Sequence, residues 1–217
     1  MNCELQKTSL SIPTQVIVQT PVILGADTKL NLTQFNAPVA NVHQYIYQNT
    51  RYRGLVNGMV IPSKELYNLF VVEGQDLNEL SITIPSDCVL QTNFGTEREL
   101  VERFISLTND GIEEIKTFPS LFASTNKYGG ATDDAHQAIL GLVTNIEIVG
   151  GAVKIDFQGY VAVPQQTLNN MQESLRFAWA AMRNELNHVH WAIKRVDLIE
   201  VLRPAIPNIP PLFSQAH

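Results

Sequence analysis

The sequence predicts an α+β fold with an antiparallel sheet, and three observations support this fold class. The segment 144–157, TNIEIVGGAVKIDF, has the pattern of two alternating strands joined by a pair of glycines. Apolar residues recur at helical spacing between residues 164 and 187. Strand-like runs dominate residues 1–90, and no internal repeat is present. A sheet packed against a long amphipathic helix accounts for all three patterns.

The hairpin over 144–157 specifies its own register. A Gly-Gly turn tolerates the positive φ that tight hairpins require. It pairs Ile148 with Val153, and Glu147 with Lys154 as a cross-strand ion pair. A slip of one residue would turn both charges toward the core, which makes other registers unfavourable. The apolar face then carries Ile146, Ile148, Val153, Ile155 and Phe157.

Other short strands are predicted from composition and alternation. Strand-like runs occupy much of 14–62, and shorter strands are expected at 69–72, 80–84 and 119–125. An extended segment is expected at 188–194, HVHWAIK. Most of the β-structure before the hairpin therefore falls in the first part of the chain.

Three capping patterns predict shorter helices. They start at Thr96, Asp110 and Asp197, and each is followed three residues later by a glutamate. In this spacing the two side chains satisfy free backbone N–H groups at a helix start. On the first of these helices, Glu99 and Arg103 have the i,i+4 spacing of an ion pair.

A continuous apolar stripe predicts a long helix from about 164 to 187, packed on the sheet. Pro164 suits its first position, because the missing N–H is not needed there. The stripe consists of Leu168, Met171, Leu175, Trp179, Met182 and Leu186. The proline-rich stretch 205–217 is expected to be extended or disordered.

These elements divide the chain into three parts. They are a β-rich N-terminal half at 1–90, an α+β half at 91–204 and a proline-rich tail at 205–217. A chain of 217 residues buries about 70% of its surface, enough for its own core. We therefore expect the two halves to dock into one globular unit.

Composition limits the kinds of partner. Charged residues make up 17% of the chain, against about 25% in ordinary domains, and Asn, Gln and Thr take their place. Neutral amides are easier to desolvate in a contact than charges, so a homo-oligomer or a complex with a protein partner is expected. The net charge of −6 argues against nucleic acid as the main partner, because phosphate binding needs a concentrated basic face.

The N-terminus and the cysteines favour a bacterial or similar cytoplasm. The first residues lack the pattern of a secretion signal, and no apolar run is long enough to span a membrane. Cys3 and Cys88 form no close-spaced motif and are expected to be free thiols in a reducing compartment. The glycine pairs extend to no phosphate-binding or dinucleotide fingerprint, so no cofactor is expected.

His188 and His190 are the first candidate metal ligands. Residues two apart on an extended segment point the same way, so the two rings can share an ion. Glu185 or Asp197 could supply a third ligand. In the alternative interpretation His190 and Trp191 close the end of the long helix, with polar tips at the surface.

Asp133, Asp134 and His136 form a second candidate cluster. They could bind a divalent ion or act as an acid and base. The alternative is a solvated loop, because the cluster follows two glycines in a polar segment.

Two further patterns are typical of other ligands. Asp87 and the Glu114-Ile115-Lys116 run resemble a metal-dependent nuclease core, but that Glu-x-Lys must lie on a strand and here follows a helix cap. Arg51, Tyr52 and Arg53 place two guanidiniums on one face of a predicted strand, where they could bind an anionic ligand. A solvated or ion-paired sheet face is the alternative.

A resemblance to a known kind of module covers residues 95–203. It is carried by FPSLFAST, AILGLVTNI, VKIDFQGYVAVPQQ and NELNHVHWAIKRVDLIEVL. These strings resemble small accessory modules found in bacteria beside, or fused to, effectors of anti-phage defence. The resemblance lies in hydrophobic rhythm and the HWAIK-x-VDL run. It implies a sensing or effector-docking role and assigns no active-site residue.

The function that follows is a non-enzymatic binding or interaction module, possessing a sensing or docking role in a bacterial defence system. One alternative is a metal-dependent hydrolase or nuclease whose ligands converge from separate loops. The other alternative is a nucleotide or anion sensor.

Overall fold

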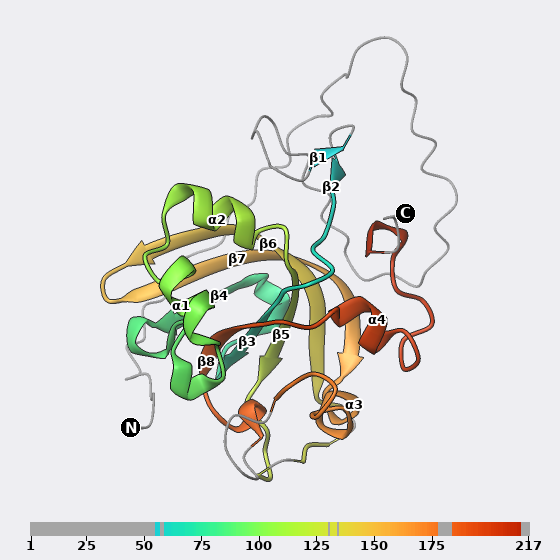
Figure 1. Cartoon of the computed structure of the whole chain (residues 1–217). Helices are drawn as coiled ribbons and strands as arrows, with labels where there is room; N and C mark the ends of the chain where they lie inside the picture. The colour runs from blue at the N-terminus through green and yellow to red at the C-terminus, as the bar shows by residue number, and fades with distance from the viewer. Residues whose placement is uncertain (1–54, 57–58, 130, 134, 178–183, 214–217) are drawn as a thin grey trace, which may run out of the picture. The chain divides into compact units, whose positions relative to one another are not determined.

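The computed structural model describes residues 55–56, 59–129, 131–133, 135–177 and 184–213 (Figure 1). Its centre is a six-stranded sheet with the strand order β4-β7-β6-β5-β3-β8. The strands are β3 (Tyr67–Val72), β4 (Ser81–Pro85), β5 (Pro119–Ser124), β6 (Gln137–Val149), β7 (Ala152–Pro164) and β8 (His190–Lys194). A separate two-stranded hairpin consists of β1 (Leu55–Val56) and β2 (Met59–Val60).

The α+β class is confirmed, but the sheet is mixed and not purely antiparallel. β3 and β5 run parallel, and the other neighbouring pairs are antiparallel. Parallel neighbours need a crossover connection, and here the chain passes through β4 and two helices before it returns beside β3. The predicted boundary near residue 90 falls inside this crossover, so strands from both sides of it share one sheet.

The hairpin formed by β6 and β7 has the predicted register. Ile148 pairs with Val153, and Glu147 with Lys154. Two details differ from the prediction. The Lys154 ammonium lies 3.2 Å from Asp156 on its own strand and forms its ion pair there. Ile148, near the tip, is 63% exposed, because the hairpin extends past the core.

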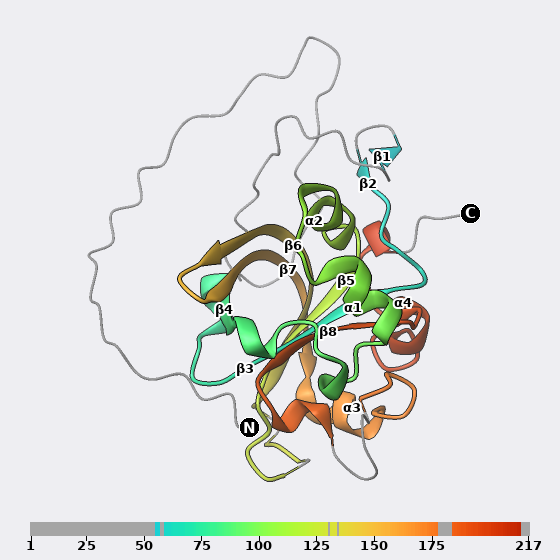
Figure 2. The ribbon, with the colours of Figure 1, turned by 60° about the vertical axis from the view of Figure 1, so that its left-hand side comes forward.

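Two pairs of helices cover the two faces of the sheet (Figures 1 and 2). One face packs against α1 (Arg98–Phe104) and α2 (Asn109–Ile115) through Leu100, Phe104 and Ile115. The other packs against α3 (Gln165–Asn170) and α4 (Leu198–Leu202) through Leu168, Leu198, Ile199 and Leu202. Short 3-10 helices lie at Leu77–Glu79, Ser86–Cys88, Thr92–Phe94, Glu185–Asn187 and Pro211–Phe213.

The predicted long helix is wrong. α3 ends at Asn170, and Arg176 has a φ of 56°, a left-handed conformation that no helix can contain. Phe177, off the predicted stripe, is fully buried like Leu175. Short separate segments therefore bury the apolar residues. Trp179 and Met182 lie outside the described residues.

The caps differ in part from the prediction. Asp197 caps α4 as expected, and accepts the N–H of Glu200 at 3.1 Å. The N-cap of α1 is Glu97 and has no side-chain cap, because Thr96 Oγ1 accepts the N–H of Ile193 at 3.3 Å. The N-cap of α2 is Thr108, two residues before the predicted one.

Hydrogen bonds cover both outer strands of the sheet. Beside β8, the N–H of Leu90 donates to Trp191 O at 2.8 Å. Beside β4, the carboxamide of Gln75 donates to Thr83 O and accepts the N–H of Thr83, both at 2.8 Å. The main-chain groups of Thr83 on one edge and the carbonyl of Trp191 on the other are therefore already bonded.

Part of the C-terminal tail is packed, which corrects the expectation of an extended or disordered segment. Phe213 is buried, and its ring contacts Tyr160 edge to face at 5.5 Å. The predicted strands at 14–54 lie outside the described residues.

Cys88 is fully buried and disulfide-bonded, so the expectation of a free thiol is wrong at this position. The other cysteine of the chain, Cys3, lies outside the described residues. In the described part of the chain, no helix combines the length and apolar character needed to cross a membrane.

Candidate functional site

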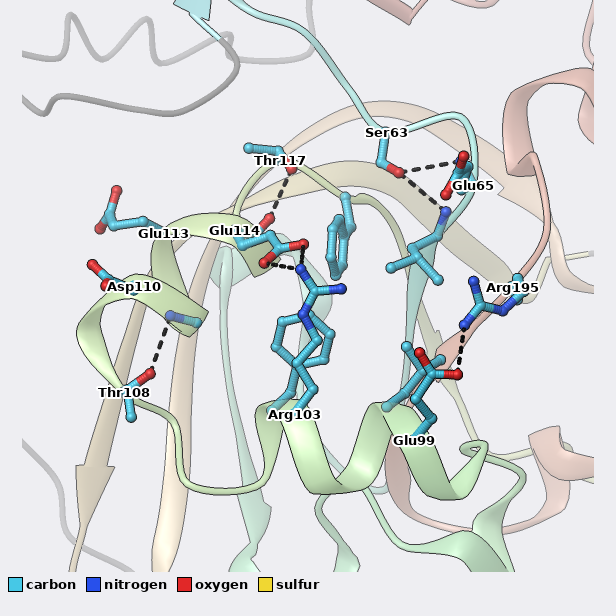
Figure 3. A pocket seen from close by; sticks show the side chains of 15 residues that line it. Ser63, Glu65, Glu99, Arg103, Thr108, Asp110, Glu113, Glu114, Thr117 and Arg195 are labelled. Carbon is cyan, nitrogen blue, oxygen red and sulfur yellow. Dashed lines mark hydrogen bonds and ion pairs between the residues drawn. The ribbon is translucent and has the colours of Figure 1, made fainter.

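The candidate functional site is a surface pocket of about 890 Å³ beside α1 and α2, which we call the α1–α2 pocket (Figure 3). Its lining comes from the segment before β3, from both helices, from the turn before β5 and from Arg195 after β8. Segments separated by more than a hundred residues therefore meet here. The volume is within the range of about 300 to 1,000 Å³ that is typical of ligand sites.

The turn between the helices sets one wall of the pocket. Leu107 has a φ of 44°, which is rare for leucine, and its side chain is buried. Thr108 Oγ1 then accepts the N–H of Gly111 at 3.2 Å and starts α2. As a result α2 folds back beside α1, and Glu114 comes to lie opposite Arg103 (Figure 3).

The opposite wall is held by Ser63. Its hydroxyl accepts the N–H groups of Glu65 at 3.2 Å and Leu66 at 3.1 Å. Its own N–H donates to Thr117 O at 2.9 Å, which ties the segment before β3 to the end of α2. The carboxylate of Glu65 is thereby placed in the lining.

The pocket has an apolar floor. Leu66, Leu100, Phe104 and Phe118 are all buried and all line it. The rings of Phe104 and Phe118 meet edge to face at 5.7 Å. These residues belong to the sheet core, so the floor is rigid.

Charged side chains form the rim. The carboxylates are Glu65, Glu99, Asp110, Glu113 and Glu114, and the guanidiniums are those of Arg103 and Arg195. Two positive and five negative groups leave a net charge of −3 when all are ionised. A concave surface with an excess of one sign concentrates ions of the other sign, so the pocket favours cations.

Arg103 and Glu114 form an ion pair across the pocket. One guanidinium nitrogen, Nη2, donates to both carboxylate oxygens at 2.7 Å. The guanidinium carbon lies 4.9 Å from the centre of the Phe104 ring. The side chains are 54% and 38% exposed, and such pairs contribute only about 0.2 to 1 kcal/mol.

Arg195 joins the rim to the start of α1. Its Nε lies 3.3 Å from Glu97, and its Nη2 lies 3.6 Å from Glu99. Glu97 also pairs with Arg176 at 3.3 Å. Glu99, predicted to pair with Arg103, therefore pairs with Arg195, because Arg103 is drawn to α2.

The polar side chains of the lining are carboxylates, guanidiniums and hydroxyls. Within the described part of the chain the lining contains neither histidine nor cysteine. The hydroxyls of Ser63 and Thr108 accept main-chain N–H groups, and that of Thr117 donates to Glu114 O at 2.7 Å. An apolar floor below a carboxylate rim suits the aliphatic stem and charged head of a lysine or arginine.

His190 lies away from this pocket, on β8, and is fully buried. Its Nδ1 lies 2.8 Å from His188 O, and since a carbonyl only accepts, Nδ1 carries a proton. Its Nε2 lies 3.3 Å from Glu185. Both ring nitrogens are therefore engaged, and sharing an ion with His188 would require their release.

Glu185 is the centre of a buried polar group. It forms an ion pair with Lys194 at 2.5 Å, and Lys194 also donates to Gly95 O at 3.0 Å. Burial lowers the pKa of Lys194, and the Glu185 carboxylate opposes that shift. Burial, followed by the same carboxylate, raises the pKa of Tyr67. This group holds the chain around β8 and is closed to solvent.

The Asp133 cluster lies at the same end of the sheet as His190. Asn126, in the loop between β5 and β6 that carries Asp133, donates its N–H to Leu186 O, just before β8, at 2.8 Å. A hydrogen bond from Lys127 lowers the pKa of Asp133. Asp133 Oδ1 and His136 Nε2 are buried without a partner among the described residues. Asp134 lies outside those residues, and within them no three His, Cys, Asp or Glu side chains could hold a metal.

The remaining predicted residues form no site in the described structure. Glu114 lies on α2 and bonds Arg103, and Lys116 bonds Glu113 at 2.7 Å, so the Glu-x-Lys run is helical as expected. Asp87 lies in a 3-10 helix. Arg51, Tyr52 and Arg53 lie outside the described residues.

Sequence reasoning missed the α1–α2 pocket. In the sequence Arg103 has the spacing to pair with Glu99, Glu114 belongs to the Glu-x-Lys run, and nothing links Ser63 or Arg195 to them. The local signal was the two capping patterns at 96 and 110, which predict consecutive short helices.

No protein-family model, no curated protein and no solved structure matches this chain. The fold and the site define a class of protein: an α+β domain with a mixed sheet and an acidic surface pocket. The resemblance to accessory modules of anti-phage defence stays a prediction.

Proposed function

We propose that this protein is a non-enzymatic interaction module that docks a basic segment of a protein partner in the α1–α2 pocket. The observation that carries this proposal is the net charge of −3 on a rim above an apolar floor. A basic side chain can place its methylene stem on that floor and its charged head among the carboxylates.

Exposed carboxylates are suited to recognition. Glu99 is 79% exposed and Glu114 38%, so a ligand can reach both carboxylates from solvent. Charges at such a rim raise the association rate and reject partners of like charge. Binding should therefore weaken as salt rises.

The experiment measures binding of a short fluorescein-labelled peptide of alternating glycine and arginine by fluorescence anisotropy. Glu65→Gln/Glu99→Gln removes two rim carboxylates and should weaken binding about tenfold. The matched control is Glu73→Gln/Glu79→Gln, because both side chains are exposed, lie outside the lining and change the net charge equally.

The control variant should stay within about twofold of the wild type. Equal losses in the two variants would mean that the peptide responds to net charge alone, which contradicts docking in the pocket. Docking of a basic segment would also be contradicted if a glycine–glutamate peptide bound as tightly as the glycine–arginine peptide.

Self-assembly, a role in a bacterial defence system and a cytoplasmic location are part of the same proposal. Light scattering after size exclusion tests self-assembly, and a strictly monomeric particle would contradict it.

Disulfides are rare in reducing compartments, so the oxidation state of Cys88 tests the cytoplasmic location. Alkylation of Cys88 in cells lysed directly into denaturant, which exposes the buried side chain, would support the cytoplasm, and a Cys88 that reacts only after chemical reduction would contradict it.

The two alternatives stay predictions. A metal-dependent hydrolase would draw on His188, His190, Asp133, Asp134 and His136, and a rise in melting temperature with Mg²⁺, Mn²⁺ or Zn²⁺ would favour it. An anion sensor would draw on Arg51 and Arg53, and stabilisation by a nucleotide would favour that.

A further inference from the structure

We infer that Arg103 is an internal occupant of the α1–α2 pocket, and that an arginine side chain of the partner replaces it on Glu114. This inference rests on the proposed function and narrows the ligand to a guanidinium. It also makes the Arg103–Glu114 pair a competitor that sets the affinity of the pocket.

The position of Arg103 identifies the ligand chemistry. Its guanidinium carbon lies 4.9 Å from the Phe104 ring centre, and its Nη2 lies 2.7 Å from both oxygens of Glu114. An aromatic face together with a carboxylate is the environment that guanidinium groups favour. A lysine ammonium can use the carboxylate but does not stack in the same way.

The geometry of the pair makes it replaceable. Arg103 bonds Glu114 through one nitrogen, whereas the strongest arginine–carboxylate pairs use two nitrogens in a fork. A ligand guanidinium that approaches from solvent is free to take the forked arrangement. Both side chains of the existing pair are also partly exposed, at 54% and 38%, so water can reach and separate them.

Arg103 has a second partner available after its release. Glu99 lies four residues earlier on the same helix, at the i,i+4 spacing of helical ion pairs. Arg195, which now lies 3.6 Å from Glu99, would keep its contact with Glu97 at 3.3 Å. The released guanidinium therefore remains charge-paired.

The test compares Arg103→Ala with Arg98→Ala. Arg98 lies on the same helix, is 87% exposed and lies outside the pocket lining, and its loss changes the net charge equally. Arg103→Ala should bind the glycine–arginine peptide about tenfold more tightly than the wild type, and Arg98→Ala within about twofold. Arg103→Ala/Glu114→Gln should lose the gain, because the carboxylate has gone.

A second measurement uses methylguanidinium chloride at low millimolar concentration, with methylammonium chloride and sodium chloride as controls. Methylguanidinium should fill the place of the missing side chain and raise the melting temperature of Arg103→Ala by about 1 to 3 °C. It should not change Arg98→Ala or the wild type.

The outcomes separate the two ideas. If Arg103→Ala binds the peptide more weakly than the wild type, or as Arg98→Ala does, the inference is overturned. Docking would still be supported if Glu65→Gln/Glu99→Gln weakens binding. Stabilisation of Arg103→Ala by methylguanidinium, with no peptide bound by any variant, would support the guanidinium site and contradict docking of a partner segment.

Discussion

Gly95 is a position at which a single added methyl group should destabilise the fold. Its φ is 81°, in the left-handed region, and a Cβ there would overlap Lys194 Nζ and Glu185 Oε1. Those atoms form the buried ion pair behind β8, where neighbouring side chains leave little room for a shift.

The expected loss has two parts. A residue with a Cβ in the left-handed conformation costs about 1 to 2 kcal/mol. Breaking a buried ion pair costs about 3 to 5 kcal/mol, of which a displaced pair loses a part. Gly95→Ala should therefore lower the free energy of unfolding by about 3 kcal/mol or more.

Gly74→Ala is the matched control. Gly74 has a φ of 65°, and a Cβ there would meet nothing within 4 Å. This variant should show only the backbone part, about 1 to 2 kcal/mol. The assay is urea unfolding, followed by tryptophan fluorescence that includes the buried Trp191. The slope of the unfolding free energy against urea concentration is compared between the two variants. Losses that agree within about 0.5 kcal/mol would refute the role of the ion pair.

Two other predictions use the same urea assay. Glu185→Gln leaves Lys194 buried without its partner and should lower the free energy of unfolding by about 3 to 5 kcal/mol. Glu185→Leu/Lys194→Met should lower it by less than that single change. A double variant at least as unstable as Glu185→Gln would contradict this. Burial raises the pKa of Asp156, but hydrogen bonds from three side chains outweigh it and hold the pKa below 3.8. The stability from Asp156 is therefore present above the unfolded-state pKa and is lost as the pH falls through the lower folded-state pKa. Asp156→Asn should flatten the fall in the urea midpoint below about pH 4. An unchanged fall would refute it.

The hairpin was predictable because its information is local. The glycine pair and the alternation around it specify which residues face each other, and the pairing of Glu147 with Lys154 follows. The choice of Asp156 as the partner of Lys154 was not predictable, because Ser81 of β4 and Asn145 of β6 hold that carboxylate at 2.7 and 3.3 Å.

The long helix failed because periodicity reports burial and not helical geometry. Leu168, Leu175 and Leu186 are all buried as the stripe requires, but each lies in a different short segment. The left-handed φ of Arg176 interrupts the path, and arginine carries no sequence signal for that conformation.

The α1–α2 pocket could not be predicted from the sequence for a related reason. Its pair of Arg103 and Glu114 depends on the angle between two short helices, which the buried turn at Leu107 determines. Arg195 arrives from beyond β8. Local patterns predict the helices and leave their packing angle open.

The bonded groups beside β4 and β8 bear on how other chains can approach this sheet. A free strand edge is a template on which a foreign strand can grow the sheet, either as a recognition mode or as the start of aggregation. The carboxamide of Gln75 occupies the middle of one border, and the segment around Leu90 occupies the other. An added strand would have to displace these groups, so strand addition at the middle of β4 and at Trp191 of β8 is disfavoured.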